Sequence, residues 1–276
     1  MRERATTTRA RPAPYVLSAV EFDVVWRGLG LGAPPVVLQL PSPGRTHRER
    51  RRVEAEAWAT LRDRGFAPGS DLMQLLGLLA APSPRVEVRA WGTSTRRAVV
   101  AASRSESRSE SRGDGGVVAR RRDDTVVVEP CGSVAGAVIG LLAGGRPGPG
   151  RAASVPGPEL DEALRRPSGA GLRADLVTLG VDPAEAGLVA RMLHAVAGRA
   201  QINVVVPDRW GVLRRSGELL EVLDGPAGRY LLTRTCGGDG TCWTTVAPVD
   251  DRRLLHRVAE LLSPGRRAAS AAGPLR

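Results

Sequence analysis

Two stretches decide the fold: TVVVEPCGSVAGAVIGLLAGG at residues 125–145 and WTTVAPVDDRRLLHRVAELLSPG at residues 243–265. Each begins as an extended run, passes through a proline and continues into a helix that ends at glycine or proline. Apolar residues at helical spacing give the second stretch one apolar face: Leu254, Leu255, Val258, Leu261 and Leu262. A unit that occurs twice predicts two halves that are related by pseudo-symmetry.

Helices precede the strands in each half. Capping boxes, in which Ser, Thr or Asp is followed three residues later by Glu, predict helices that begin after Ser18, Thr46 and Asp182. A short apolar helix is expected over residues 71–80. An extended run, introduced by two prolines, is expected over residues 36–40.

Antiparallel strands are predicted in two blocks, over residues 86–129 and 201–247. One block alone leaves a sheet face bare, so the two halves are expected to share one sheet with helices packed on it. The sequence thus predicts an α+β fold with internal pseudo-symmetry. GGRPGPGR at residues 144–151 is expected to be a linker or a wide turn between the halves.

The domain division follows from composition. Residues 1–14 and 264–276 are expected to be basic, disordered tails. Residues 15–263 are expected to form one domain, with halves at about 15–143 and 152–263.

The net charge of +11 suggests an anionic partner such as nucleic acid. The two terminal tails contribute +3 each, so only +5 remains on the body of the chain. That distribution disfavours a nucleic-acid groove, although a basic nucleic-acid-binding or regulatory protein remains the alternative. The chain has no apolar stretch of membrane-spanning length and no apolar signal core near its start, so we expect a cytoplasmic protein without a membrane span.

TCGGDGTCW at residues 235–243 raises the question of a metal or redox site. Five residues separate Cys236 from Cys242, a spacing that fits neither zinc knuckles nor redox motifs. The other candidate ligands are scattered along the chain: Cys131, His47, His194 and His256. We therefore expect no metal and no cofactor. The glycines predict a hairpin tip across which the two cysteines face each other. They could touch or bond under oxidation, but a reducing cytosol argues against a permanent disulfide.

Catalytic patterns are equally absent from the sequence. It has no G-x-S-x-G elbow, and RGLGLG at residues 27–32 lacks phosphate-loop spacing. We expect no enzyme. A small-molecule enzyme remains a further alternative that would need a polar pocket.

SRSESRSES at residues 103–111 is the strongest candidate for a binding segment. Its simplest interpretation is a solvated loop between two strands, and the sharper one is an adaptable contact loop held by a rigid sheet. Candidate partner-binding residues are Ser103, Arg104, Glu106, Arg108, Glu110 and Arg112. The exposed part of the sheet is the other candidate surface.

Taken together, several short motifs resemble the EspG family, the cytoplasmic chaperones of mycobacterial-type ESX (type VII) secretion. The resemblance covers about residues 15–263. The motifs that carry it are Glu21-Phe22, Trp26, Leu31-Gly32, Pro35, Pro41-Ser42, Gly44 to Thr46, Glu49, Trp58, Leu61, Arg64-Gly65, Gly228 to Tyr230 and Trp243 to Pro248.

The resemblance implies a chaperone that binds secreted PE–PPE heterodimers, covers an apolar tip of the PPE protein and keeps the pair soluble for export. It also implies a central antiparallel sheet with helical bundles and a quasi-two-fold relation between halves. The family's loop between the second and third main strands contacts the partner, and residues 103–111 occupy that place here. Because this loop is low-complexity, no contact residue is carried over. The resemblance leaves two kinds of client open: a PE–PPE pair or another secreted helical-hairpin protein.

Overall fold

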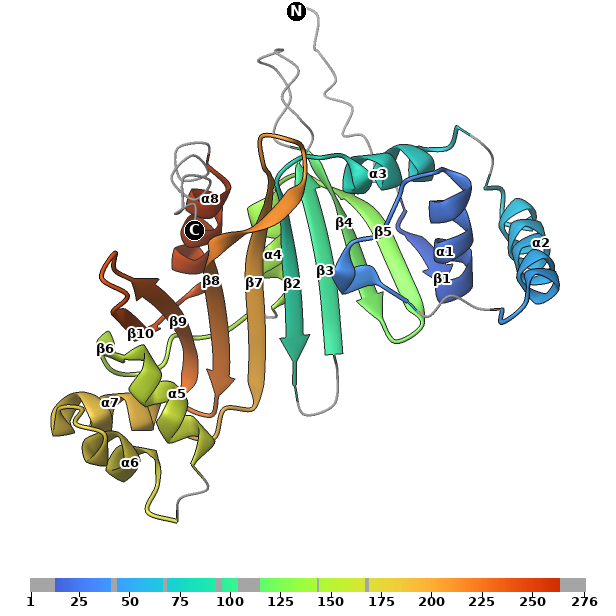
Figure 1. The fold of residues 1–276 in the computed structure, drawn as a ribbon. Helices are drawn as coiled ribbons and strands as arrows, with labels where there is room; N and C mark the ends of the chain where they lie inside the picture. The colour runs from blue at the N-terminus through green and yellow to red at the C-terminus, as the bar shows by residue number, and fades with distance from the viewer. Residues whose placement is uncertain are drawn as a thin grey trace, which may run out of the picture.

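A computed structural model describes residues 13–40, 44–66, 69–92, 96–103, 115–142, 144–166 and 169–263. Ten strands in these ranges form one sheet with the order β1-β5-β4-β3-β2-β7-β8-β9-β10-β6. Every neighbouring pair is antiparallel. The sheet runs across the whole molecule in Figure 1.

The first half comprises β1 (Tyr15–Ser18), α1 (Ala19–Gly28), the 3-10 helix η1 (Val36–Leu38), α2 (His47–Asp63), α3 (Asp71–Ala80), β2 (Arg85–Trp91), β3 (Arg96–Ser103), β4 (Gly116–Arg122), β5 (Thr125–Cys131) and α4 (Val134–Leu141). The second half comprises β6 (Ala153–Pro156), α5 (Gly157–Arg165), α6 (Leu172–Thr178), α7 (Pro183–Met192), β7 (Gly198–Pro207), β8 (Leu213–Gly225), β9 (Gly228–Cys236), β10 (Cys242–Pro248) and α8 (Asp251–Leu262).

The two halves repeat the same path. β2 and β7 pair at the centre of the sheet, and each half continues outward through its next three strands to its own first strand at the edge. The helices also match, with three before the main strands and one after them in each half. The α+β fold with a central antiparallel sheet and pseudo-symmetric halves is therefore confirmed. The two stretches that predicted it are β5–α4 and β10–α8.

Helices cover both faces of the sheet. On one face α4 and α8 pack together over apolar residues from both halves, including Val88 and Ile202. On the other face α1 and α3 cover the first half, while α5 and α7 enclose a separate core with the second half. Figure 1 shows these two groups of helices at opposite ends of the sheet. Between them, Figure 1 shows a part of the central sheet face that no helix of the described residues covers.

The predicted caps form at the helix starts. Ser18 with Glu21 and Thr46 with Glu49 make reciprocal capping boxes at α1 and α2. The third box is only half right. Asp182 accepts from the first turn of α7, but Glu185 reaches across to the backbone N–H of Ser154, at 3.3 Å.

One local prediction is corrected, and the strands show details that the sequence did not specify. Residues 36–38 form a 3-10 turn instead of an extended run. The turn is closed by a hydrogen bond from the N–H of Leu38 to the carbonyl of Pro35. The short edge strands β1 and β6 were not predicted. Residues 213–225 form one strand, with an irregularity opposite Asn203 and Val205.

The segment predicted as a linker packs closely on β9. Arg229 N–H donates to the carbonyl of Arg146 at 2.7 Å, and Gly148 N–H donates to the carbonyl of Arg229 at 3.1 Å. A Cβ at Gly148 would lie 2.1 Å from Cζ of Tyr230, so this position tolerates only glycine. The chain between the halves is therefore held against β9 by backbone pairing.

Candidate functional site

An apolar groove lies on the open part of the sheet in the second half, between α5 and strands β7 to β9. Its volume is 710 Å³. It is lined by Leu160, Asp161, Leu164, Leu193, Val196, Arg199, Gln201, Gly217, Leu219, Glu221, Leu223, Leu232, Arg234 and Cys236. The groove thus combines the sheet face with the apolar side of α5 and the chain that leaves α7.

The apolar lining reaches solvent. Leu164 is 57% exposed and Val196 is 37% exposed, whereas Leu160 beside them is buried in the core beneath α5. Leu160 and Leu164 are four residues apart, so both lie on the groove side of α5. Apolar surface gathered in a concave site is typical of a contact surface for a partner.

The charged side chains at the groove are paired with one another. Arg199 forms an ion pair with Glu221 on the neighbouring strand. Nη2 and Nη1 of Arg234 donate to the two carboxylate oxygens of Asp161, at 2.7 and 3.0 Å. This hydrogen bonding raises the pKa of Arg234 above its usual value. Because these charges already have partners, the groove favours an apolar ligand over an ionic one.

The cysteine hairpin borders one end of the groove. Cys236 and Cys242 are directly opposite each other in the β9–β10 register, as predicted. They form a disulfide in this structure, the bond that the sequence left open under oxidising conditions. The positive φ of Gly240 and the side-chain bonds of Asp239 to Thr241 shape the tip. In the described part of the chain, no three His, Cys, Asp or Glu residues gather closely enough to hold a metal ion.

The predicted loop site falls mostly outside the described residues. Ser103 ends β3, where its backbone pairs with Gly116 at the start of β4. The other candidates lie outside the described ranges: Arg104, Glu106, Arg108, Glu110 and Arg112. The loop thus begins at the end of the sheet where β7 leads into the turn that holds Trp210. Trp210 is 69% exposed, and the guanidinium of Arg209 lies over its ring.

The sequence pointed to the exposed part of the sheet as a second candidate surface but not to the groove or its residues, because the walls of the groove are far apart in the chain. The one local signal is the helix of residues 157–165, whose apolar side extends to the exposed Leu164. Nothing in the sequence places that helix over β8 and β9, since this contact depends on the whole second-half topology.

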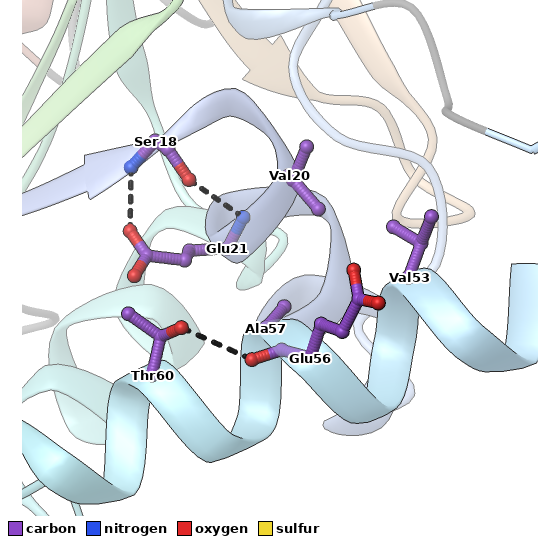
Figure 2. Close-up of a pocket in the computed structure, with 7 residues that line it drawn as sticks. All are labelled: Ser18, Val20, Glu21, Val53, Glu56, Ala57 and Thr60. Atoms are coloured by element: carbon purple, nitrogen blue, oxygen red, sulfur yellow. Dashed lines mark hydrogen bonds between the residues drawn. The ribbon is translucent and has the colours of Figure 1, made fainter.

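A smaller hollow between α1 and α2 has a different character. Its volume is 480 Å³, and its labelled lining includes Val20, Val53 and Ala57 (Figure 2). Figure 2 shows the carboxylate of Glu21 accepting from the backbone N–H of Ser18. Arg64, at the end of α2, also donates to this carboxylate at 2.9 Å. The carboxylate of Glu21 is therefore used in holding α1 and α2 in place.

No described helix has the length and apolar character that a membrane crossing requires. The site of interest in the second half is thus the apolar groove with its paired charges, and the described residues hold no metal cluster beside it.

Comparisons with known proteins agree with the fold and the sequence motifs. The structure is similar to a solved structure described as the Mycobacterium tuberculosis type VII secretion system chaperone EspG5 in complex with PE25-PPE41 dimer. The TM-score is 0.65 at 19% sequence identity, over 91% of this chain and 96% of that chain. No curated protein matches the sequence. A family model described as the EspG family matches residues 18–260, and the chain belongs to this family.

Proposed function

We propose that this chain is a chaperone of type VII secretion that binds a PE–PPE-type or other helical-hairpin client heterodimer. It covers the apolar tip of the client and keeps the pair soluble for export. The proposal is supported by membership of the EspG family and by a fold shared with EspG5, which was solved in complex with a PE25-PPE41 dimer. We further propose that the chain acts in the cytoplasm and works by binding, without catalysis.

The apolar groove carries the proposal. A chaperone for an aggregation-prone tip needs apolar surface that is open in the free protein and can be buried on binding. The groove supplies this surface at Leu164 and Val196, and its paired charges keep it soluble without demanding an ionic partner. We therefore propose that the client tip lies in the groove.

The loop after β3 is proposed as a second contact. Its anchor at Ser103 is separated from β8 by β2 and β7, which corresponds to about 14 Å at the usual strand spacing. The groove extends toward the other end of the sheet, where Arg199 pairs with Trp91, so the eleven-residue segment would meet the part of a client that projects from the groove toward Ser103. Arg104 and Glu106 are among the loop residues proposed to contact it.

Co-expression with a PE–PPE pair encoded beside this gene tests the proposal. We expect a soluble complex that co-purifies with the chain. Leu164→Glu should abolish co-purification, because it places a charge in the apolar groove where the wild-type side chain is already exposed. Val177→Glu is the matched control, since Val177 is 39% exposed on α6 and lies outside the groove lining.

Two outcomes would count against the proposal. If no PE–PPE or helical-hairpin pair forms a complex, the chaperone function fails. If Leu164→Glu and Val177→Glu bind the client equally well, the function could stand but the groove would not be its site. Affinity for nucleic acid that falls steeply with salt, together with no client binding, would instead favour the basic alternative.

A further inference from the structure

A second pocket lies beside the C-terminal end of α7. Its charged lining residues are all basic, whereas the apolar groove has charges of both signs. The pocket lies between α6, α7 and the turn at Pro149, and its volume is 640 Å³. Arg173, Arg191 and His194 line it, and no acidic side chain does. His194 follows directly after Leu193, which lines the apolar groove, so the two sites are neighbours.

The two arginines converge on one point. A Cβ built on Gly187 would lie 3.5 Å from Nη1 of Arg191 and 3.6 Å from Nε of Arg173. Arg191 is one turn after Gly187 on α7, and Arg173 reaches the same place from α6. Two guanidinium groups therefore share the space that the missing side chain of Gly187 leaves open.

The two arginines of this pocket differ from those of the apolar groove, which are paired with carboxylates. Neither Arg173 nor Arg191 forms an ion pair with a carboxylate in the described ranges, whereas Arg199 and Arg234 at the groove each have one. Two like charges held close together repel each other, and an anion between them removes that repulsion. Arginine is also suited to carboxylates, because its planar fork of N–H groups matches their two oxygens.

The floor of the pocket identifies the kind of anion. Met192 and the ring of Tyr230 are buried beneath it, and the Tyr230 hydroxyl donates to the carbonyl of Pro149 at 3.2 Å. The partly exposed Leu188 and Ala190 give the pocket its accessible apolar surface. The floor thus offers apolar surface and the rim offers positive charge. A free phosphate would use only the rim, whereas a peptide that carries carboxylates between apolar residues would use both.

We propose that this pocket binds an acidic peptide segment of a protein partner. A carboxylate of the segment lies between Arg173 and Arg191, and its apolar neighbours contact Leu188 and Ala190. The site is separate from the apolar groove, so it stands whether or not that groove binds a PE–PPE pair.

The test uses the full chain and three probes: a short dye-labelled peptide of Glu and Leu, its Gln–Leu counterpart, and inorganic phosphate as a competitor. The Arg173→Gln/Arg191→Gln variant should bind the Glu–Leu peptide at least tenfold more weakly than wild type. The matched control is Arg48→Gln/Arg51→Gln, which removes the same charge from exposed positions on α2 and should bind like wild type. Fluorescence anisotropy measures each affinity.

Four results would overturn the proposal. Wild type could fail to bind the Glu–Leu peptide, or it could bind the Gln–Leu peptide equally well. The two double variants could lose affinity to the same extent, which would show a general response to net charge. Inorganic phosphate, at the same concentration as the Glu–Leu peptide, could displace that peptide completely from the protein, which would indicate a site for small anions.

Discussion

Nη1 of Arg229 donates to Oδ1 of Asp251 at 2.7 Å, which joins β9 to the first turn of α8. The same guanidinium bonds both carboxylate oxygens of Asp224, at 2.7 and 3.1 Å, and the carbonyl of Leu142 at 2.8 Å. Arg229 is 2% exposed. One buried side chain therefore connects the end of α4 in the first half with β8 and α8 in the second.

Arg229→Met should destabilise the fold by about 3 kcal/mol, the size expected when a buried, charge-assisted network loses one partner. The methionine retains most of the apolar stem but leaves the carbonyl of Leu142 without this donor. Asp224 and Asp251 are each 43% exposed and can be hydrated, which limits the loss. Urea unfolding followed by circular dichroism gives the free energy of unfolding.

Arg52→Met is the control for this change, because Arg52 pairs with Glu56 in an exposed position on α2. Its unfolding midpoint should match that of wild type. Equal midpoints for the Arg229 and Arg52 variants would show that the buried network does not hold the halves together.

Gly148→Ala should destabilise the protein by about 2 kcal/mol, because the added methyl would overlap the ring of Tyr230. Gly144→Ala is the matched control four residues earlier, where the nearest atom would be 3.9 Å from the new Cβ, at Asp251. Thermal unfolding of both variants separates the contact from a general effect of losing glycine. A melting temperature for Gly148→Ala equal to that of Gly144→Ala would contradict the close packing.

The same segment shows what the sequence could and could not predict. Residues 144–151 contain four glycines and two prolines, a composition typical of a linker. Here glycine has another role, since it allows the backbone to approach Arg229 and Tyr230. Local composition indicates an absence of regular structure, but it does not distinguish a free chain from one packed on a distant strand.

Elements with their own local signal were predicted well. The capping boxes at Ser18 and Thr46 define the starts of α1 and α2, because a cap is a contact between residues three apart. The edge strands β1 and β6 have four residues each and exist through pairing with β5 and β10. The groove depends on such distant contacts throughout, so the sequence predicted the function class but not this site.

Asp23 on α1 should make the stability of the protein depend on pH. Its carboxylate lies 2.6 Å from Nη2 of Arg50 on α2 and 3.0 Å from Nε of Arg27. Burial alone would raise the pKa of Asp23, but the hydrogen bonds and charges of Arg50 and Arg27 prevail and lower it below its ordinary value of 3.8. The stabilisation is therefore fully present above that value and is lost as the pH falls through the lower folded-state pKa.

Asp23→Asn should consequently lower the melting temperature near neutral pH, and its difference from wild type should shrink below about pH 3.9. Asp63→Asn is the control, because Asp63 is exposed at the end of α2. A difference between Asp23→Asn and wild type that stays constant from pH 7 to about pH 2 would show that the ion pair does not stabilise the fold.

Replacing both Cys236 and Cys242 by Ser should leave the fold and client binding intact. The disulfide closes a short loop within a hairpin that backbone pairing already forms, so its loss should cost about 2 kcal/mol at most. Wild type in reducing buffer should unfold like the double variant. Stoichiometric zinc binding by reduced wild type, absent in the variant, would contradict a purely structural role.

Replacing residues 104–114 by a short glycine-rich turn should preserve folding but weaken client binding. The β3–β4 ladder from Ala98–Arg121 to Ser103–Gly116 lies outside the replaced segment, and paired strand ends need only a short connection. The melting temperature should therefore stay within a few degrees of wild type, while affinity for a PE–PPE pair falls at least tenfold. A charge-neutral variant of the full-length loop, with Arg104, Glu106, Arg108, Glu110 and Arg112 changed to Gln, separates length from charge. Unfolding of the shortened variant would show that the segment is structural, and unchanged affinity in both variants would exclude it from the client interface.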